Sequence, residues 1–226
     1  MHTTRHALVT PAHATSYLAG GPEEGPLLVF VHGWPGLGST WHYQLEHFAA
    51  RGYRVAAPDI AAPGRGNRKA GQCVHADPAV HSRPAARSVT TRDGGWFGGA
   101  PSAPDAPLSS TVLTERDFEN LTDALTRNGF EGPTGYYLNH EVNARYANAA
   151  PGHGVLRLPV LFVGAAYDQV ADLASPMALD AMRSTCPELT EAIAPAGHWL
   201  QLEAAPAVNT HIESWLTSGV ADPGLW

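Results

Sequence analysis

The chain has 226 residues, of which 44% are hydrophobic and 15% charged, and its formal net charge is −7 at pH 7. This length suits one domain and is ample for burying a hydrophobic core. The acidic balance argues against nucleic-acid binding, because the phosphate backbone is bound chiefly by clustered lysine and arginine side chains. No apolar run approaches the roughly 18 residues that span a membrane, and no signal peptide is evident. Cys73 and Cys186 define no disulfide framework, so we expect a soluble, cytoplasmic domain.

The N-terminal part of the chain predicts a β-α-β unit. The apolar run Pro26–His32 is typical of a strand buried on both faces, as in a helix-covered parallel sheet. Apolar residues at helical spacing predict a helix over 41–49, with Ser39 or Thr40 as the candidate cap. Residues 53–57 then predict a second strand. Two short stretches before the first strand, 7–9 and 15–18, favour a hairpin at the sheet edge.

The pattern breaks between residues 61 and 107. This stretch contains no Leu, Ile or Glu, while Arg, Ala, Pro, Gly, His and Ser dominate it. It lacks the apolar surface that would offset the entropy of ordering, so we predict an irregular or disordered segment.

Regular patterns resume at Leu108. Thr114 and Asp117 are spaced as in a capping box, which predicts a helix ending near Gly129. A second helix is expected over 134–149. The remaining predicted elements are a doubly buried strand over 158–164, a helix near 176–185, a strand over 189–194 and a final helix over 206–218.

Three short loops follow predicted strands and carry the chemistry: His32-Gly-Trp-Pro35, Tyr167-Asp168 and Gly197-His-Trp199. In open α/β sheets, functional groups gather at the carboxyl ends of the strands. An acid after one strand and a His after the next is the chain order in which α/β-hydrolases complete their triad. The acid orients the imidazole, which then acts as a general base.

Several motifs in the correct order resemble the epoxide hydrolase branch of the α/β-hydrolases. They are His32-Gly-Trp-Pro-Gly36, Ala57-Pro-Asp59, Pro63-Gly-Arg-Gly66, the stretch 120–139, the stretch 158–170 and Gly197–Glu203. The similarity covers about residues 20–66 and 108–217.

The resemblance implies roles for five residues. His198 would activate the hydrolytic water and Asp168 would orient it. Trp34 would lend its backbone N–H to the oxyanion hole, and the peptide bond that follows it would be cis. Tyr137, with Tyr136 as its rival, would donate a hydrogen bond to the epoxide oxygen and assist ring opening as an acid. His32 would have a structural role.

The chain departs from the family at the nucleophile. The family places an Asp on a strand–turn–helix elbow between the second motif and the cap, and no strong elbow is present. The nearest candidate is Asp93, within Thr91-Arg-Asp-Gly-Gly95. Without a carboxylate there, no alkyl-enzyme ester can form, and the acid–His pair has no ester to hydrolyse.

Two explanations of the segment 67–107 compete. It is either genuine, in a divergent and trimmed hydrolase, or it reflects a coding frame that shifts after about Gly66 and recovers before Leu108, with a deletion. We favour the second hypothesis, because both flanks match the family while the composition of the segment resembles out-of-frame translation of GC-rich DNA. An intact frame on re-sequencing the locus would rule it out.

The sequence therefore predicts an α/β-hydrolase-like fold with a mainly parallel sheet that is flanked by helices and incomplete in the middle. The expected parts are 1–66 (first part of the core), 67–107 (irregular), 108–150 (a small helical cap) and 151–226 (second part of the core). The expected function is hydrolysis of a small hydrophobic epoxide through an aspartyl ester, without cofactor, metal, nucleic-acid or membrane partner. The alternatives are a related esterase or dehalogenase, or a catalytically inactive remnant that acts as a binding protein.

Overall fold

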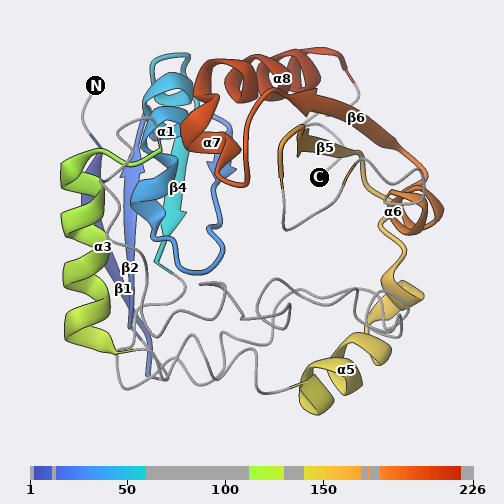
Figure 1. Ribbon diagram of the computed structural model, residues 1–226, viewed down its shortest axis with the longest axis horizontal. Helices are drawn as coiled ribbons and strands as arrows, with labels where there is room; N and C mark the ends of the chain where they lie inside the picture. The colour runs from blue at the N-terminus through green and yellow to red at the C-terminus, as the bar shows by residue number, and fades with distance from the viewer. Residues whose placement is uncertain are drawn as a thin grey trace, which may run out of the picture.

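The structure of the protein is a computed structural model that describes residues 3–11, 14–59, 112–129, 140–168, 173 and 179–219 (Figure 1). In chain order the strands are β1 (Thr4–Val9), β2 (Ala14–Gly20), β3 (Leu27–Val29), β4 (Arg54–Pro58), β5 (Val160–Ala165) and β6 (Leu189–Ala194). The α-helices are α1 (His42–Ala49), α3 (Glu115–Asn128), α5 (His140–Asn148), α6 (Asp180–Thr185), α7 (Leu200–Glu203) and α8 (Ala205–Thr217), and the 3-10 helices are η1 (Gly38–Trp41) and η5 (Pro151–Gly154).

The described strands form two sheets. One has four strands in the order β1-β2-β4-β3, and the other is the pair β5-β6. Strands β1 and β2 form the predicted antiparallel hairpin at the sheet edge, and β3 runs parallel to β4 with Leu28 opposite Val55. Strands β5 and β6 are also parallel, with Val163 opposite Ala192. The predicted edge hairpin and the β-α-β unit are confirmed.

Strand β3 is shorter and more exposed than its apolar sequence predicts. Its ladder covers three residues, and Leu27, Val29 and Val31 are more than half exposed, at 56%, 54% and 53%. Phe30, on the opposite face, is buried. The expectation of burial on both faces is thus wrong, because within the described ranges β3 is an edge strand that pairs with β4 alone and is covered on one face. Strand β5 is likewise mostly half-buried.

The main hydrophobic core lies between α1 and the four-stranded sheet. Leu45 and Phe48 of α1 and Val55 and Ala57 of β4 are fully buried. The Phe48 ring packs against Phe30, with ring centroids 6.0 Å apart. The predicted apolar stripe of the 41–49 segment thus faces the core. The helix itself begins at His42, after the 3-10 turn η1, so Ser39 and Thr40 lie within that turn and do not cap it.

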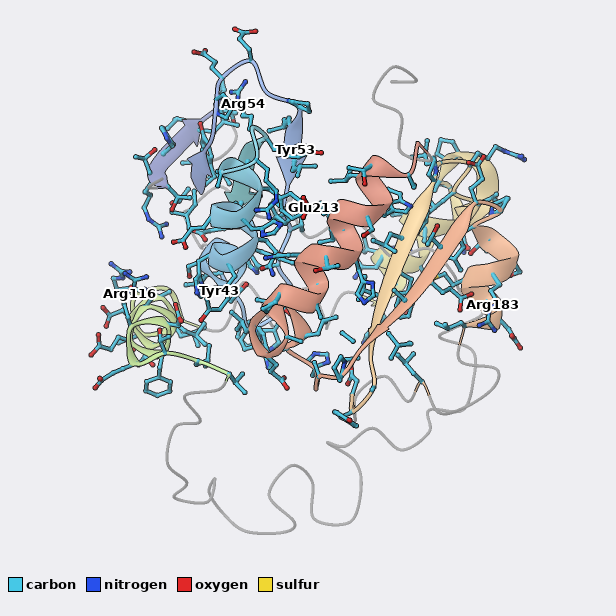
Figure 2. All side chains as sticks on the ribbon, turned by 90° about the horizontal axis from the view of Figure 1, so that it is seen from above. Tyr43, Tyr53, Arg54, Arg116, Arg183 and Glu213 are labelled. Atoms are coloured by element: carbon cyan, nitrogen blue, oxygen red, sulfur yellow. The ribbon has the colours of Figure 1, made fainter. Side chains whose placement is uncertain are left out.

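Helix α8 joins the two sheets. Seen from above, it lies between the block that contains α1 and the β5-β6 pair (Figure 2). Its residues Ile212 and Leu216 pack on the core around Phe48, while the helix also contacts β5 and β6. The buried amide of Gln44 adds a polar link, since its Nε2 donates to the carbonyl of Gln201 at 3.1 Å.

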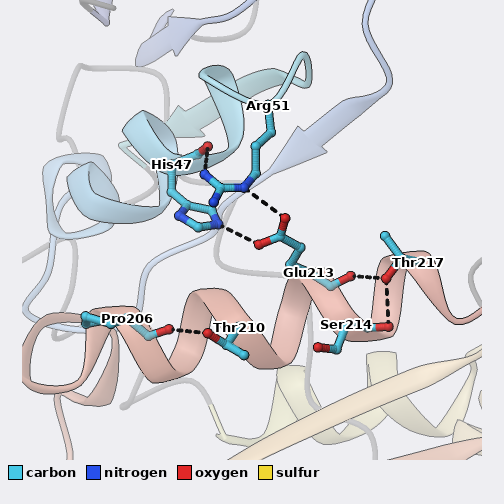
Figure 3. Close-up of polar contacts among 7 residues, drawn as sticks. All are labelled: His47, Arg51, Pro206, Thr210, Glu213, Ser214 and Thr217. Atoms are coloured by element: carbon cyan, nitrogen blue, oxygen red, sulfur yellow. Dashed lines mark hydrogen bonds and ion pairs between the residues drawn. The ribbon is translucent and has the colours of Figure 1, made fainter.

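A polar cluster also ties α1 to α8 (Figure 3). Arg51 Nε donates to Glu213 Oε1 at 2.9 Å, and His47 Nε2 lies 3.1 Å from Glu213 Oε2. The hydrogen bond from Arg51 is the main reason that the pKa of the Glu213 carboxyl is below its usual value. Because the side chains of Arg51 and Glu213 are 44% and 39% exposed, their ion pair adds little stability, and the apolar contacts of α8 contribute most of its attachment to the core.

Helix α3 begins as its sequence predicts. The Thr114 hydroxyl accepts from the backbone N–H of Asp117, and the Asp117 carboxylate accepts from the N–H of Thr114, which completes the capping box. The helix ends at Gly129, whose positive φ of 68° favours glycine. Helix α5 covers the second part of the expected 134–149 helix; the first part lies outside the described residues, as does the whole segment 67–107.

The C-terminal elements follow the predicted order. Strand β6 has the expected bounds, 189–194, and α8 is displaced by a single residue from the expected 206–218. Helix α6 covers the end of the expected 176–185 helix. Across the described ranges, we find no helix long and apolar enough to cross a bilayer.

Candidate active site

The structure brings Asp168 and His198 together at the carboxyl ends of two adjacent parallel strands. Asp168 follows β5 and His198 follows β6, and His198 Nδ1 lies 3.0 Å from Asp168 Oδ2. The Asp168 side chain is largely buried, at 11% exposed, whereas the His198 side chain is 50% exposed. This buried carboxylate therefore anchors one nitrogen of a ring that remains accessible on its other side.

Backbone hydrogen bonds hold the two loops in register. The N–H of Ala166 donates to the carbonyl of Ala194 at 2.9 Å, and the N–H of Tyr167 donates to the carbonyl of Ala196 at 2.9 Å. The parallel ladder thus continues past the ends of β5 and β6. Asp168 and His198 are 30 residues apart in the chain, and this continuation is what places them side by side.

The hydrogen bond to Asp168 determines the chemistry that His198 can perform. A carboxylate accepts a hydrogen bond from a neutral imidazole only if the bonded nitrogen carries the proton. Here the bonded atom is Nδ1, so Nε2 has a free electron pair and can accept a proton from water. The carboxylate also stabilises the positive charge that the ring then acquires.

Trp34 lies in the loop that follows the carboxyl end of β3, in the four-stranded sheet. The loop contains a turn in which the N–H of Gly36 donates to the carbonyl of Gly33 at 2.8 Å, and the Trp34–Pro35 peptide bond is cis, as the family resemblance implied. Asp59, which is buried, holds the end of this loop, because its Oδ1 accepts from the N–H of Gly38 at 2.9 Å.

Arg5 completes the support of this loop. Its Nη1 donates to Asp59 Oδ2 at 2.7 Å and to the hydroxyl of Ser16 at 2.8 Å. The carboxylate of Asp59 is therefore paired on both oxygens, as a buried charge requires. The edge hairpin β1-β2 thus contributes to the position of the loop that contains Trp34.

His32 precedes this loop, and its ring nitrogen Nδ1 lies 2.9 Å from the carbonyl oxygen of Gly33. Burial disfavours the charged imidazolium, and this is the main reason that the pKa of His32 is below its ordinary value. The hydrogen bond to Gly33 and the negative charge of Asp59 oppose the shift. These contacts agree with a structural role.

The shift of His32 predicts a pH dependence of stability. A histidine whose pKa is lower in the folded state binds its proton more readily when unfolded, so its contribution is intact above the unfolded value of about 6.5 and is lost as the pH falls. We expect the thermal unfolding midpoint to fall between pH 8 and pH 5.5, and to fall less in His32→Asn. The exposed His140→Asn is the control and should fall like the unmodified protein. An equal fall in His32→Asn would contradict the prediction.

Two of the predicted site residues, Asp93 and Tyr137, lie outside the described residues, and so does Tyr136. Their roles as nucleophile and acid therefore stay predictions. In the described part of the chain, no three His, Cys, Asp or Glu side chains are grouped so that they could hold a metal ion.

An apolar pocket lies between η1, α3 and the loop that follows His198. Its lining residues are Leu37, Ser39, Thr40, Leu113, Asp117, Leu121, Trp199 and Leu202. Trp199 is the direct neighbour of His198, and Leu37 belongs to the loop that contains Trp34. The pocket thus adjoins both loops that carry predicted site residues.

The sequence reasoning missed two residues that support the site. They are Asp59, described above, and Glu203 of α7, whose carboxylate accepts two backbone hydrogen bonds from the His198 loop. Both lie within motifs that the family resemblance used, but neither was assigned a role. Each is an acid close to a predicted site loop. Asp59 directly follows a predicted strand, and Glu203 lies five residues after His198.

Comparisons with known proteins agree with this architecture. No family model matches the chain. The chain is 31% identical over 123 residues, or 54% of its length, to bifunctional epoxide hydrolase 2 of Rattus norvegicus. It is 33% identical over 100 residues, or 43% of its length, to epoxide hydrolase B of Mycobacterium tuberculosis. These matches span 22% and 27% of the two relatives, so the chain covers about a quarter of their length.

A solved structure extends the comparison to the fold. An epoxide hydrolase from an endophytic Streptomyces superposes with a TM-score of 0.73 at 22% sequence identity, covering 97% of this chain and 96% of that one. The fold is therefore that of the α/β-hydrolases, as the sequence predicted. In sequence, the chain is similar to curated epoxide hydrolases over about half of its own length.

Proposed function

We propose that the protein hydrolyses an epoxide to a 1,2-diol through an ester on its own chain. The observation that carries the proposal is the hydrogen bond between His198 Nδ1 and Asp168 Oδ2 at the carboxyl ends of β5 and β6. This pair supplies a general base of the correct tautomer. The curated relatives named above are epoxide hydrolases, which supports the same reaction class.

The first step assigns the nucleophile to Asp93 and the acid to Tyr137. A carboxylate oxygen of Asp93 attacks one epoxide carbon, the ring C–O bond breaks, and the Tyr137 phenol gives its proton to the departing oxygen. The acid is needed because an alkoxide is a poor leaving group, and a phenol is a suitable donor at this position. The product is a β-hydroxyalkyl ester of Asp93 and a Tyr137 phenolate.

The second step uses the described pair. His198 Nε2 accepts a proton from water, and the resulting hydroxide adds to the ester carbonyl, whose developing negative charge the backbone N–H of Trp34 stabilises. Collapse of the tetrahedral intermediate releases the diol and restores the Asp93 carboxylate. The proton on His198 then returns through solvent to the Tyr137 phenolate, so the balance is one epoxide plus one water to one diol.

The apolar pocket that Trp199 helps to line supports a hydrophobic substrate. Its walls are mainly leucine side chains and the Trp199 indole, which favour an aliphatic or aromatic substituent on the epoxide. We propose further that residues 108–150 act as a small cap and that 1–66 and 151–226 form the two parts of the core. A cytoplasmic location stays a prediction.

Two assays and one trapping experiment test the function. We expect the purified full chain to hydrolyse styrene oxide and not a p-nitrophenyl ester. In His198→Gln, the ester on Asp93 should accumulate, and mass spectrometry should detect its added mass on the peptide that contains Asp93. The exposed His140→Gln is the matched control and should turn over normally.

The other outcomes identify the alternatives. Cleavage of the p-nitrophenyl ester alone would assign an esterase, and halide release from a haloalkane would assign a dehalogenase. If the chain turns over none of these substrates and no ester forms in His198→Gln, the proposal is wrong and an inactive remnant is the better description.

A further inference from the structure

We propose that Glu203 is a positioning residue that fixes the backbone on both sides of His198. Its Oε2 accepts from the N–H of Gly197 at 2.8 Å, and its Oε1 accepts from the N–H of Trp199 at 3.1 Å. One carboxylate therefore binds the backbone N–H groups of the residues directly before and after the histidine. The inference rests on the proposed function only in giving His198 a catalytic role.

Helix α7 is what brings this carboxylate back onto the loop. The backbone N–H groups of Leu202 and Glu203 both donate to the carbonyl of Trp199, at 2.8 and 2.9 Å. Trp199 thus accepts from the main chain of Glu203 and donates to its side chain, which closes the segment into a ring of hydrogen bonds. Within this ring the orientation of the His198 Cα–Cβ bond is fixed, so the imidazole is aimed at Asp168.

Gly197 makes the close approach possible. A Cβ built at this position would lie 2.9 and 3.0 Å from the two carboxylate oxygens of Glu203, closer than real Cβ atoms come to other atoms. The φ of Gly197 is not in the positive range, so an alanine fits the backbone and conflicts only with the Glu203 side chain. A flexible side-chain end would be displaced by that methyl group. Gly197→Ala therefore displaces the carboxylate and weakens the same two hydrogen bonds without removing its charge.

Charge strengthens both bonds. Hydrogen bonds from backbone N–H groups to a carboxylate are about twice as strong as those between neutral partners. Glu203→Gln keeps the size of the side chain but removes the charge and turns one acceptor into an NH₂ donor, which faces an N–H. We therefore expect the loop to open locally in this variant while the fold around Phe48 is retained.

The first test is amide hydrogen exchange and imidazole ¹⁵N NMR on the full chain. We expect the amides of Gly197 and Trp199 to exchange about 10- to 100-fold faster in Glu203→Gln than in the unmodified protein, the ratio expected for losing a charge-assisted hydrogen bond. The population of the His198 tautomer protonated at Nδ1 should fall. Gly197→Ala should have the same effects, and the double variant should add little to either.

A matched control separates positioning from general stability. Glu191 on β6 also binds a partner through both oxygens, since Arg183 Nε and Nη2 each donate to it at 2.7 Å. Glu191→Gln should leave the exchange of Gly197 and Trp199 and the tautomer of His198 unchanged. The amide exchange of Phe48 reports on the global fold in every variant.

The outcomes decide the inference whether or not the chain is an epoxide hydrolase. If Glu203→Gln lowers the unfolding midpoint but leaves both amides or the tautomer unchanged, Glu203 only caps α7 and the inference is wrong. If the unmodified chain also turns over styrene oxide, Glu203→Gln should lower kcat about 10-fold or more and change KM by a smaller factor, because the base is misplaced while Trp199 is one of eight residues that line the pocket. An inactive unmodified chain would overturn the proposed function, while exchange and tautomer would still decide the role of Glu203.

Discussion

Phe48→Ala is expected to lower the free energy of unfolding by about 3–5 kcal/mol, the cost of truncating a buried phenylalanine. Phe48 is fully buried and contacts Phe30 and Tyr53 through its ring, with centroids 6.0 and 5.7 Å away. Ile212 and Leu216 of α8 pack on the same cluster. The truncation therefore weakens both the four-stranded sheet and the helix that joins it to the β5-β6 pair.

Urea denaturation followed by circular dichroism measures the effect. A loss of this size is a large part of the roughly 5–15 kcal/mol that stabilises a typical domain. Phe118→Ala removes the same side chain from α3, where it is 47% exposed, and is expected to change the free energy far less. Equal losses in the two variants would contradict the placement of the core around Phe48.

Under the proposed function, Asp168→Asn is expected to lower the rate of epoxide hydrolysis by about 10⁴-fold, the size of effect found when the orienting acid of a Ser-His-Asp triad becomes an amide. An asparagine offers an NH₂ donor or a neutral carbonyl to His198 Nδ1, so the Nδ1-protonated tautomer is no longer favoured. Attack on the epoxide does not use His198, so the ester should still form. The variant should therefore show a burst of ester followed by very slow turnover.

Rapid-quench kinetics with styrene oxide and mass spectrometry of the chain measure the two steps separately. Asp180→Asn is the control, because Asp180 is an exposed acid on α6 that pairs with Arg183 and lies outside the site. It should retain normal turnover. An Asp168→Asn variant that neither forms ester nor turns over would show that Asp168 does more than orient the histidine.

The sequence predicted the elements whose signals are local. The capping box at Thr114 fixes the start of α3 because both of its hydrogen bonds join residues three apart. Strand β6 was predicted with its bounds because the residues on either side of it, Glu188 and Pro195, interrupt a short apolar pattern. The chain order of Asp168 and His198 likewise followed from the order of two strands and their loops.

Burial and support were decided by tertiary structure. The apolar run Pro26–His32 predicts a central strand that is buried on both faces. Burial depends on which strands and helices pack against it, and the sequence pattern does not identify them. In the described residues, β3 is exposed on one face. Tertiary contacts also explain why α1 begins at His42 and not directly after the predicted cap, Ser39 or Thr40. There, the segment Gly38–Trp41 is held as a 3-10 turn, with the N–H of Gly38 bound by Asp59.

The motifs of the chain were enough to predict an α/β-hydrolase-like fold, through the family that they resemble, and the order of strands and loops was enough to predict the acid and the histidine of the candidate site. Only the tertiary structure showed that a 3.0 Å hydrogen bond joins Asp168 to His198 and that Glu203 binds the backbone N–H groups of Gly197 and Trp199, on either side of the histidine. The first contact depends on the register of β5 against β6, and the second depends on how α7 folds back onto the His198 loop. The spacing of these residues in the sequence predicts neither arrangement.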